Sequence, residues 1–136
     1  MGEVRVKARL TNAVDHGARR GALAQDQIRT CEVGALVDRG AVRTIMPPEV
    51  AARLGLEVWG HEVAEYADGR RETVGVTGPL VVELADRRTL EEALVLGDEV
   101  LIGQTVLEKL DLFVDCQARR LVPNPAHPDR PVTKVK

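Results

Sequence analysis

The sequence has very few aromatic residues and very few cysteines. Its 136 residues include one Trp, one Tyr, one Phe and two cysteines, Cys31 and Cys116. The cysteines lie far apart, and neither belongs to a Cys-x-x-Cys pair or a cysteine–histidine cluster. We therefore expect neither a disulfide framework nor a zinc site. Because hydrophobic residues still make up 44% of the chain, Val, Leu and Ala must fill the core, which suits short, tightly packed strands.

The chain also lacks a strong net charge and a long apolar run. A formal charge of −2 gives no reason to expect nucleic acid or an anionic membrane as a partner. The Arg-Arg pairs are dispersed and flanked by acids, which is typical of solvated turns. No apolar run is long enough for a membrane span, and the first residues alternate in polarity instead of forming a secretory leader. We expect a single domain of the reducing cytoplasm.

The first third of the chain predicts two strands around a loop. Residues 3–10 alternate between apolar and charged side chains, as in a half-buried strand. Residues 11–27 lose this period and are rich in Asn, Asp, Gly and Arg, so we predict a loop insertion there. Residues 28–37 regain strand character and end in the unbroken apolar run Val33–Val37, which indicates burial on both faces. This run stops at Asp38.

The middle of the chain predicts a strand, a short helix and a hairpin. Residues 41–46 have strand character, and Pro47-Pro48-Glu49 begins a helix, because proline is tolerated in the first turn and glutamate favours the positive helix end. Gly55 is a suitable helix stop. Strand patterns return over residues 57–84. They are interrupted by Tyr66-Ala67-Asp68-Gly69-Arg70, whose Asp-Gly pair is a strong hairpin signal.

The last third predicts more strands and one further helix. The expected elements are strands at 92–96 and 100–103, a helix at 104–110, and a closing hairpin of residues 111–115 and 119–122. Residues 123–136 contain four prolines and predict an extended, exposed tail. The sequence therefore indicates one all-β domain over residues 1–122, with one or two short helices.

Two features of this pattern bear on chemistry. The first is Asp38, which ends a buried strand and is followed by Arg39-Gly40-Ala41. The second is Leu101-Ile102-Gly103, which precedes a short helix. Taken singly, an aspartate at a strand end is more often a turn former or a helix cap, and an apolar pair before glycine is usually a simple strand end. Their combination, order and spacing carry more information.

Together these segments resemble the retropepsin-like family of aspartic proteases. The resemblance covers roughly residues 28–122. It rests on Ala35-Leu36-Val37-Asp38-Arg39-Gly40-Ala41, on residues 47–56, on the Asp68-Gly69 hairpin, on Val100-Leu101-Ile102-Gly103-Gln104, and on Leu112-Phe113-Val114-Asp115.

The resemblance implies a closed β-barrel or sandwich with a flap hairpin, assembled as a homodimer. Each subunit would supply one catalytic aspartate, here Asp38, with Gly40 and Ala41 shaping its loop. Residues 66–70 would form the flap over an extended peptide or protein substrate, and residues 101–103 would support the catalytic loop. The two carboxylates would share one proton and activate a water molecule, so neither metal nor organic cofactor is implied.

Arg39 departs from the family pattern, which has Thr or Ser at this position. In the family that hydroxyl fixes the two aspartates by hydrogen bonds across the dimer axis, whereas arginine has no acceptor and is much larger. Two like charges about 4 Å apart repel by about 4 kcal/mol at an effective dielectric constant of about 20. Three outcomes are open. The dimer loosens, the guanidinium pairs with Asp38 and removes the shared proton, or Arg39 points into solvent and the site survives.

The leading hypothesis is an aspartic endopeptidase, with its activity dependent on where Arg39 lies. The alternative is a catalytically inactive pseudoprotease that binds peptides or proteins as a dimerisation module. A third possibility is a structural β-domain whose partner surface is its own edge strand.

Other polar and aromatic residues have simpler interpretations. We interpret the three histidines as surface residues, Trp59 as a cover over the edge of the core, and Asp115 as a hairpin-turn residue that pairs with an arginine. These residues are His16, His61, His127, Trp59 and Asp115.

Overall fold

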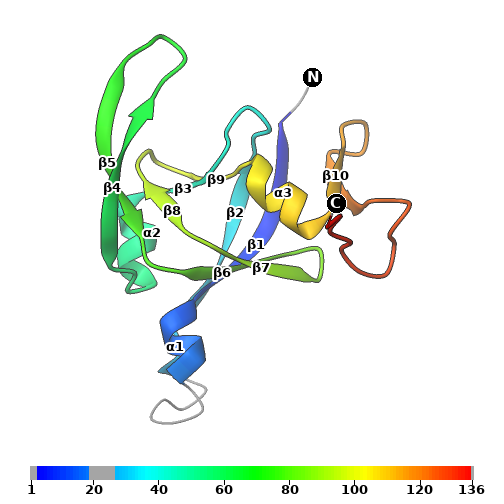
Figure 1. Cartoon of the computed structure of the whole chain (residues 1–136), viewed down its shortest axis with the longest axis horizontal. Helices are drawn as coiled ribbons and strands as arrows, with labels where there is room; N and C mark the ends of the chain where they lie inside the picture. Colours follow the sequence, from blue (N-terminus) through cyan, green and yellow to red (C-terminus); the bar gives the residue numbers. More distant parts are fainter. Residues whose placement is uncertain (1–2, 19–26, 136) are drawn as a thin grey trace.

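The chain is built around one large, twisted β-sheet. The computed structural model describes residues 3–18 and 27–135. The strands of the sheet are β1 (Val4–Asn12), β2 (Thr30–Val37), β3 (Thr44–Met46), β4 (Val58–Glu65), β5 (Arg71–Thr77), β6 (Leu80–Leu84), β7 (Arg87–Glu91), β8 (Ala93–Val95) and β9 (Val100–Ile102). Their order across the sheet is β4-β5-β8-β3-β9-β2-β1-β6-β7, and Figure 1 shows them wrapped around the centre of the molecule.

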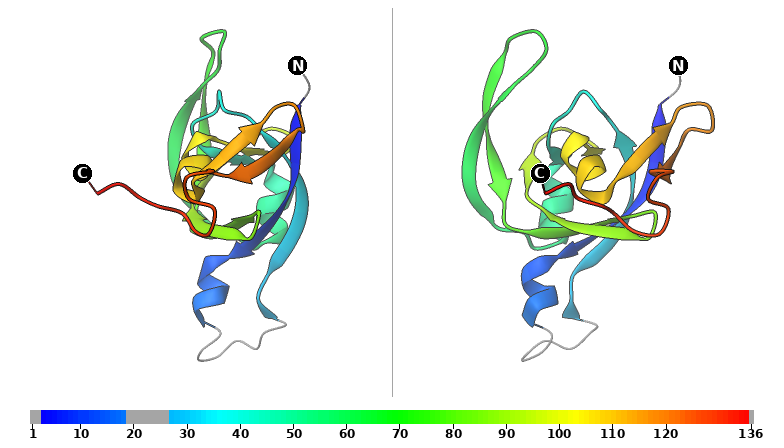
Figure 2. Two further views of the ribbon diagram at one scale, coloured as in Figure 1. Left: turned by 90° about the vertical axis from the view of Figure 1, so that its right-hand side faces the viewer. Right: turned by 45° about the vertical axis from the view of Figure 1, so that its right-hand side comes forward.

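The all-β expectation is confirmed, but the sheet is not closed. Its two end strands, β4 and β7, do not pair with each other in the described part of the chain. Strands β10 (Leu112–Asp115) and β11 (Arg120–Pro123) form a separate hairpin. Figure 2 shows the β4–β5 hairpin rising beyond the rest of the sheet, with β10 and β11 on the far side.

The expected loop after the first strand is wrong for its first half. Strand β1 continues to Asn12, and helix α1 (Ala13–Ala18) follows at once. The Asn12 side chain caps this helix, because its Oδ1 accepts a hydrogen bond of 3.0 Å from the backbone N–H of Asp15. An asparagine cap in a polar stretch therefore begins a helix that apolar periodicity did not reveal. Residues 19–26 of the expected loop lie outside the described residues.

Helix α2 (Pro48–Arg53) agrees with the expected proline start and glycine stop. Pro47 is its N-cap in an extended conformation, and Pro48 takes a first-turn position in which its missing N–H is not needed. Gly55 has φ +63°, a left-handed conformation that glycine adopts without steric cost. The helix then turns back through the hydrogen bond from Leu56 N to Ala51 O, at 2.9 Å.

Aliphatic side chains fill the core, as the composition requires. The largest fully buried apolar side chains are Leu10, Met46, Leu54, Leu80, Leu84, Ile102, Leu110, Val82 and Val106. Two of these, Val106 and Leu110, lie on helix α3 (Gln104–Leu110), which packs against β7 and β10. No helix in the described residues is both long enough and apolar enough to cross a membrane.

The C-terminal tail is largely exposed, as expected, but it is also tied to the domain. Asp111, at the end of α3, accepts hydrogen bonds from Asn124 Nδ2 at 3.0 Å and Val132 N at 3.2 Å, and its Oδ2 lies 2.6 Å from His127 Nδ1. Buried Arg87 donates to the carbonyl oxygen of His127 at 2.7 Å. His127 is therefore a partner in this anchor and not simply a surface residue.

Candidate functional site

The loop after β2 holds Asp38 in a defined orientation. The backbone N–H of Gly40 donates to Asp38 Oδ1 at 2.9 Å, and the N–H of Ala41 donates to the Asp38 carbonyl at 3.1 Å. A Cβ atom on Gly40 would come within 3.2 Å of the same Oδ1. Gly40 therefore leaves room for a carboxylate that folds back over its own loop.

The second sequence motif lies directly beside this loop. Strand β9 runs parallel to β2 and pairs Leu36 with Leu101 and Val37 with Ile102. The backbone N–H of Asp38 then donates to the Ile102 carbonyl at 2.9 Å. Two segments more than 60 positions apart in the sequence thus form one support for the Asp38 backbone.

Gly103 allows helix α3 to begin against the Asp38 loop. A Cβ atom at Gly103 would lie 2.6 Å from the carbonyl oxygen of Arg43 and 2.9 Å from that of Ala41, and both distances are too short for any side chain. The first N–H groups of α3 donate to the loop, from Gln104 to Ala41 O at 2.8 Å and from Thr105 to Val42 O at 3.1 Å. The helix start, which has spare donors, fixes the loop by its backbone.

A buried glutamate, which the sequence did not point to, reinforces this region. Glu91 is only 7% exposed. Its Oε1 accepts hydrogen bonds from the hydroxyls of Thr44 at 3.3 Å and Thr105 at 3.1 Å, and its Oε2 accepts one from Lys109 Nζ at 2.6 Å. The carboxylate therefore ties β7 to β3 and α3. The sequence places Glu91 beside exposed Glu92, with no signal to distinguish the two.

The hairpin between β4 and β5 has a tip that is closed by its own side chains. Tyr66 N donates to Arg70 O at 2.8 Å, and Gly69 N donates to Tyr66 O at 2.9 Å. Asp68 accepts hydrogen bonds from the backbone N–H of Arg70 at 3.0 Å and from its side chain at 2.9 Å. These bonds, the backbone one first, lower the pKa of Asp68. The Arg70 guanidinium also lies over the Tyr66 ring, 4.6 Å from its centroid.

A groove of about 680 Å³ connects Asp38 with the end of β4, next to the tip of this hairpin. That volume lies within the usual range of ligand sites. Of the residues singled out from the sequence, the groove lining includes Asp38, Gly40, Ala41, Tyr66 and Leu101. The lining does not include Ala67, Asp68, Gly69, Arg70, Ile102 or Gly103, which form the hairpin tip or lie behind the Asp38 loop.

Several groove residues were not expected from the sequence. They come from the β8–β9 connection, from the end of β4 and from the segment after the Asp38 loop. They are Val42, Arg43, Ile45, Ala64, Glu65, Leu94, Leu96, Gly97, Asp98 and Glu99. Only the pairing order of the sheet, with β8 between β5 and β3, brings them to this face.

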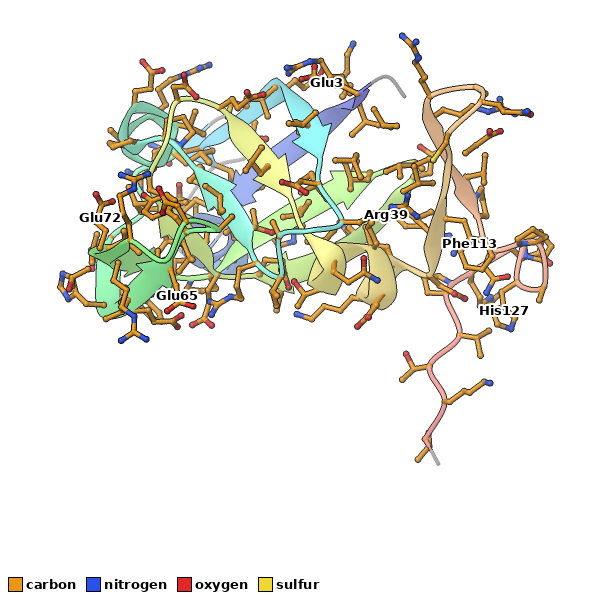
Figure 3. All side chains as sticks on the ribbon, turned by 90° about the horizontal axis from the view of Figure 1, so that it is seen from above. Glu3, Arg39, Glu65, Glu72, Phe113 and His127 are labelled. Atoms are coloured by element: carbon orange, nitrogen blue, oxygen red, sulfur yellow. The ribbon has the colours of Figure 1, made fainter. Side chains whose placement is uncertain are left out.

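Arg39 points away from the groove. Its Nη2 lies 3.8 Å from Cys116 Sγ, in the turn of the β10–β11 hairpin. It borders a separate cavity that includes Leu107 and Phe113. Figure 3 shows Arg39 on the side of the molecule that carries Phe113, remote from Glu65 at the end of β4. Within one chain, the guanidinium therefore makes no ion pair with Asp38 among the described residues.

The remaining residues interpreted from the sequence lie outside the groove. Asp115 accepts a hydrogen bond from Ala118 N at 3.1 Å and lies 3.9 Å from Arg120 Nε, as expected for a hairpin-turn residue. Trp59 packs over Gly78 and remains 61% exposed. Both cysteines are free, with Cys31 half-buried and Cys116 exposed.

No protein-family model and no curated protein matches the sequence.

Within residues 3–18 and 27–135, no group of three or more His, Cys, Asp or Glu side chains is arranged to hold a metal ion. The side chains that line the groove are carboxylates, one arginine, one tyrosine and aliphatic groups.

Proposed function

We propose that this chain is one subunit of a homodimeric aspartic endopeptidase with a retropepsin-like arrangement of strands. The observation that carries the proposal is the position of Asp38. Its carboxylate lies in a groove that extends to the tip end of a long hairpin, its Oδ1 is held by Gly40 N–H, and no basic side chain among the described residues neutralises it. A carboxylate held in this way is available to a second carboxylate, a water molecule and a peptide.

In the proposed dimer, each copy supplies one Asp38. Two carboxylates held close together cannot both ionise cheaply, so they share a proton. The ionised aspartate takes a proton from water, whose oxygen attacks the carbonyl carbon of the scissile peptide bond. The protonated aspartate donates to the carbonyl oxygen. The proton taken from water passes to the amide nitrogen as the carbon–nitrogen bond breaks, and the other aspartate takes a proton back from a hydroxyl of the tetrahedral intermediate. An amine and a carboxylic acid are released, and the shared proton is restored.

The groove suits an extended peptide. Its walls are the Asp38 loop, the end of β4 near Tyr66, and the β8–β9 connection. In the proposed complex the β4–β5 hairpin closes over the substrate and binds its main chain as an added strand would. Gly40 orients the carboxylate, and Gly103 allows the helix start to hold the loop in place.

A second candidate function is a peptide-binding dimer without catalysis, and Arg39 is the observation that favours it. Arginine cannot accept the hydrogen bond that a threonine or serine hydroxyl would accept across the axis. The Arg39 side chain lies toward Cys116, so no side-chain hydroxyl at this position braces Asp38. If the two Asp38 carboxylates of a dimer are poorly fixed, the groove would bind peptides without cutting them.

The test is cleavage of a mixed peptide library at mildly acidic pH, with pepstatin as the inhibitor. We expect cleavage that pepstatin blocks and that Asp38→Asn abolishes. Asp86→Asn makes the same chemical change at an exposed turn remote from the groove lining and should leave cleavage unchanged. Undiminished cleavage in Asp38→Asn removes Asp38 from the mechanism. Peptide binding without cleavage in the unmodified chain favours the second candidate.

A further inference from the structure

The groove carries an excess of carboxylates along its length. Four acidic residues line it, namely Asp38, Glu65, Asp98 and Glu99, against one basic residue, Arg43. The chain as a whole is nearly balanced, with 19 basic and 21 acidic residues. The negative charge is therefore a local property of this face.

The basic groups near the groove do not cancel this excess. Arg43 donates to both carboxylate oxygens of Glu62, at 3.1 and 3.0 Å, and lies 3.9 Å from Glu92. Its charge is thus met by two acids outside the groove lining. The single guanidinium of Arg5, which is outside the groove lining, is shared between Glu99, at 2.9 Å, and Glu3, at 3.0 Å.

Glu65 has a basic partner, but Asp98 does not. Glu65 Oε1 lies 2.8 Å from Arg71 Nε, with both side chains more than half exposed. Asp98 is exposed at the β8–β9 turn and pairs with no basic side chain in the described part of the chain. Asp98 and Asp38 are therefore the two groove carboxylates whose charge no neighbouring cation offsets.

Aliphatic side chains lie between these carboxylates. Leu94, Leu96 and Leu101 line the groove and remain half-buried, so they offer an apolar surface to an occupant. Lysine and arginine pack their methylene stems against such a surface and place the charged group beyond it. The four carboxylates come from three separate segments, which are the Asp38 loop, the end of β4 and the β8–β9 connection. An extended cationic chain can contact all three segments.

We infer that the groove selects extended peptides that carry lysine or arginine, with Asp98 as the main determinant of this preference. The inference rests on the proposed function, because it names the substrate class of the same groove. A basic side chain that lies along Leu94 and Leu96 brings its charge to Asp98 at one end of the β8–β9 wall. The attraction is electrostatic, so salt weakens it.

The experiment compares peptides that differ by one lysine-to-norleucine replacement, scanned along an extended sequence. Norleucine keeps the apolar stem and removes the charge. Affinity is measured by fluorescence anisotropy on Asp38→Asn, so that binding is read without turnover, and kcat/KM is measured on the unmodified chain. At one or more positions the lysine peptide should have an affinity and a kcat/KM roughly threefold to fivefold above those of the norleucine peptide. This is the factor expected for one partly exposed ion pair. Asp98→Asn should reduce that factor toward one, and the matched Asp86→Asn should not.

The outcomes separate this inference from the proposed function. Lysine preference that Asp98→Asn removes supports the inference. Peptides bound or cut with no lysine preference, or a preference that Asp98→Asn leaves intact, overturn the assignment of Asp98 while the proposed endopeptidase stands. A failure to bind or cut any peptide overturns the proposed function and this inference with it.

Discussion

Arg39 reaches Cys116 and not its neighbour Asp38. The guanidinium lies 3.8 Å from Cys116 Sγ, while Asp38 Oδ1 accepts the backbone N–H of Gly40 at 2.9 Å. The sequence left three outcomes open for Arg39. One of them, an ion pair between Arg39 and Asp38 of the same chain, does not occur in the structure. The question that remains for Arg39 is its effect on assembly of two chains.

Replacement of Arg39 by threonine should strengthen self-association. Arg39 is exposed, so we expect the free energy of unfolding of one chain to change by less than about 0.5 kcal/mol. A threonine restores a hydroxyl and removes one positive charge per subunit. We expect the dimer dissociation constant to fall roughly tenfold, about 1.4 kcal/mol, as measured by sedimentation equilibrium.

Arg88→Thr is the matched control for that change. Arg88 is an exposed residue on strand β7 at one end of the sheet, whereas Arg39 lies in the loop after β2. If Arg39→Thr and Arg88→Thr give the same dissociation constant, Arg39 does not oppose dimer formation. A rise in cleavage that accompanies tighter assembly would show that arginine holds the endopeptidase below its full activity.

Gly103→Ala should destabilise the fold through a local clash. The φ angle of Gly103 is −92°, so alanine can adopt this backbone conformation. Its Cβ, however, would meet the Arg43 carbonyl oxygen at 2.6 Å. We expect a cost of about 1–3 kcal/mol in denaturant unfolding, as for other overpacked sites, together with loosening of the Asp38 loop.

The corresponding change at Gly34 distinguishes a clash from a general effect of removing glycine. A Cβ at Gly34 meets no atom within 4 Å, so Gly34→Ala should be neutral or mildly stabilising. Equal losses of stability at both positions would contradict the account of how α3 supports the loop.

Glu91→Ala should destabilise the chain more than Glu92→Ala. Removal of the buried carboxylate leaves the Thr44 hydroxyl without this acceptor and Lys109 without its charge partner. Hydrogen bonds to charged groups contribute about 1.5–3 kcal/mol, and we expect a loss of that order in thermal or denaturant unfolding. Glu92 has a 59% exposed side chain with only a 3.9 Å contact to Arg43. A loss as large at Glu92 would argue against a special role for the Glu91 network.

The anchor of the C-terminal tail should weaken in acid. Hydrogen bonds, first from the Asn124 side chain and then from His127, lower the pKa of Asp111. A carboxyl group whose pKa is lower in the folded state stabilises the fold above its unfolded pKa, and that stability is lost as the pH falls through the folded value. We therefore measure the Tm of the unmodified chain and of Asp111→Asn between about pH 5 and pH 3, where carboxyl groups titrate. The amount by which the unmodified chain has the higher Tm should shrink as the pH falls. An advantage that is constant over this range would show that the carboxylate does not hold the tail.

Local signals in the sequence predicted much of the fold. The Asp-Gly pair at Asp68-Gly69 predicted the β4–β5 hairpin, and Pro48 and Gly55 predicted both ends of α2. The apolar runs that end at Val37 and Ile102 are the paired strands β2 and β9. The expected burial of Val33–Val37 on both faces is wrong, because only Ala35 of this run is fully buried. Each of these signals acts through backbone conformation or burial, so a single sequence contains it.

Other features depend on contacts between distant residues, and the sequence carries no local sign of them. Asp98 reaches the groove only because β8 lies between β5 and β3. Glu91 is the buried last residue of β7, whereas Glu92 follows the strand and is exposed. Helix α1 is too short to show apolar periodicity, and the Asn12 cap is its main sequence signal. The direction of Arg39 depends on the β10–β11 hairpin, 77 positions away in the sequence.

The central claim is that two copies of the chain bring their Asp38 residues together. The most direct measurement is intermolecular disulfide formation by Asp38→Cys, in a chain that also carries Cys31→Ala and Cys116→Ser. A disulfide requires Cα atoms about 4.4–6.8 Å apart, so only a pair at a shared axis can form it readily. The account predicts a covalent dimer under mild oxidation, formed far faster than by Asp86→Cys in the same background. Cross-linking no faster than that of Asp86→Cys would contradict the shared site.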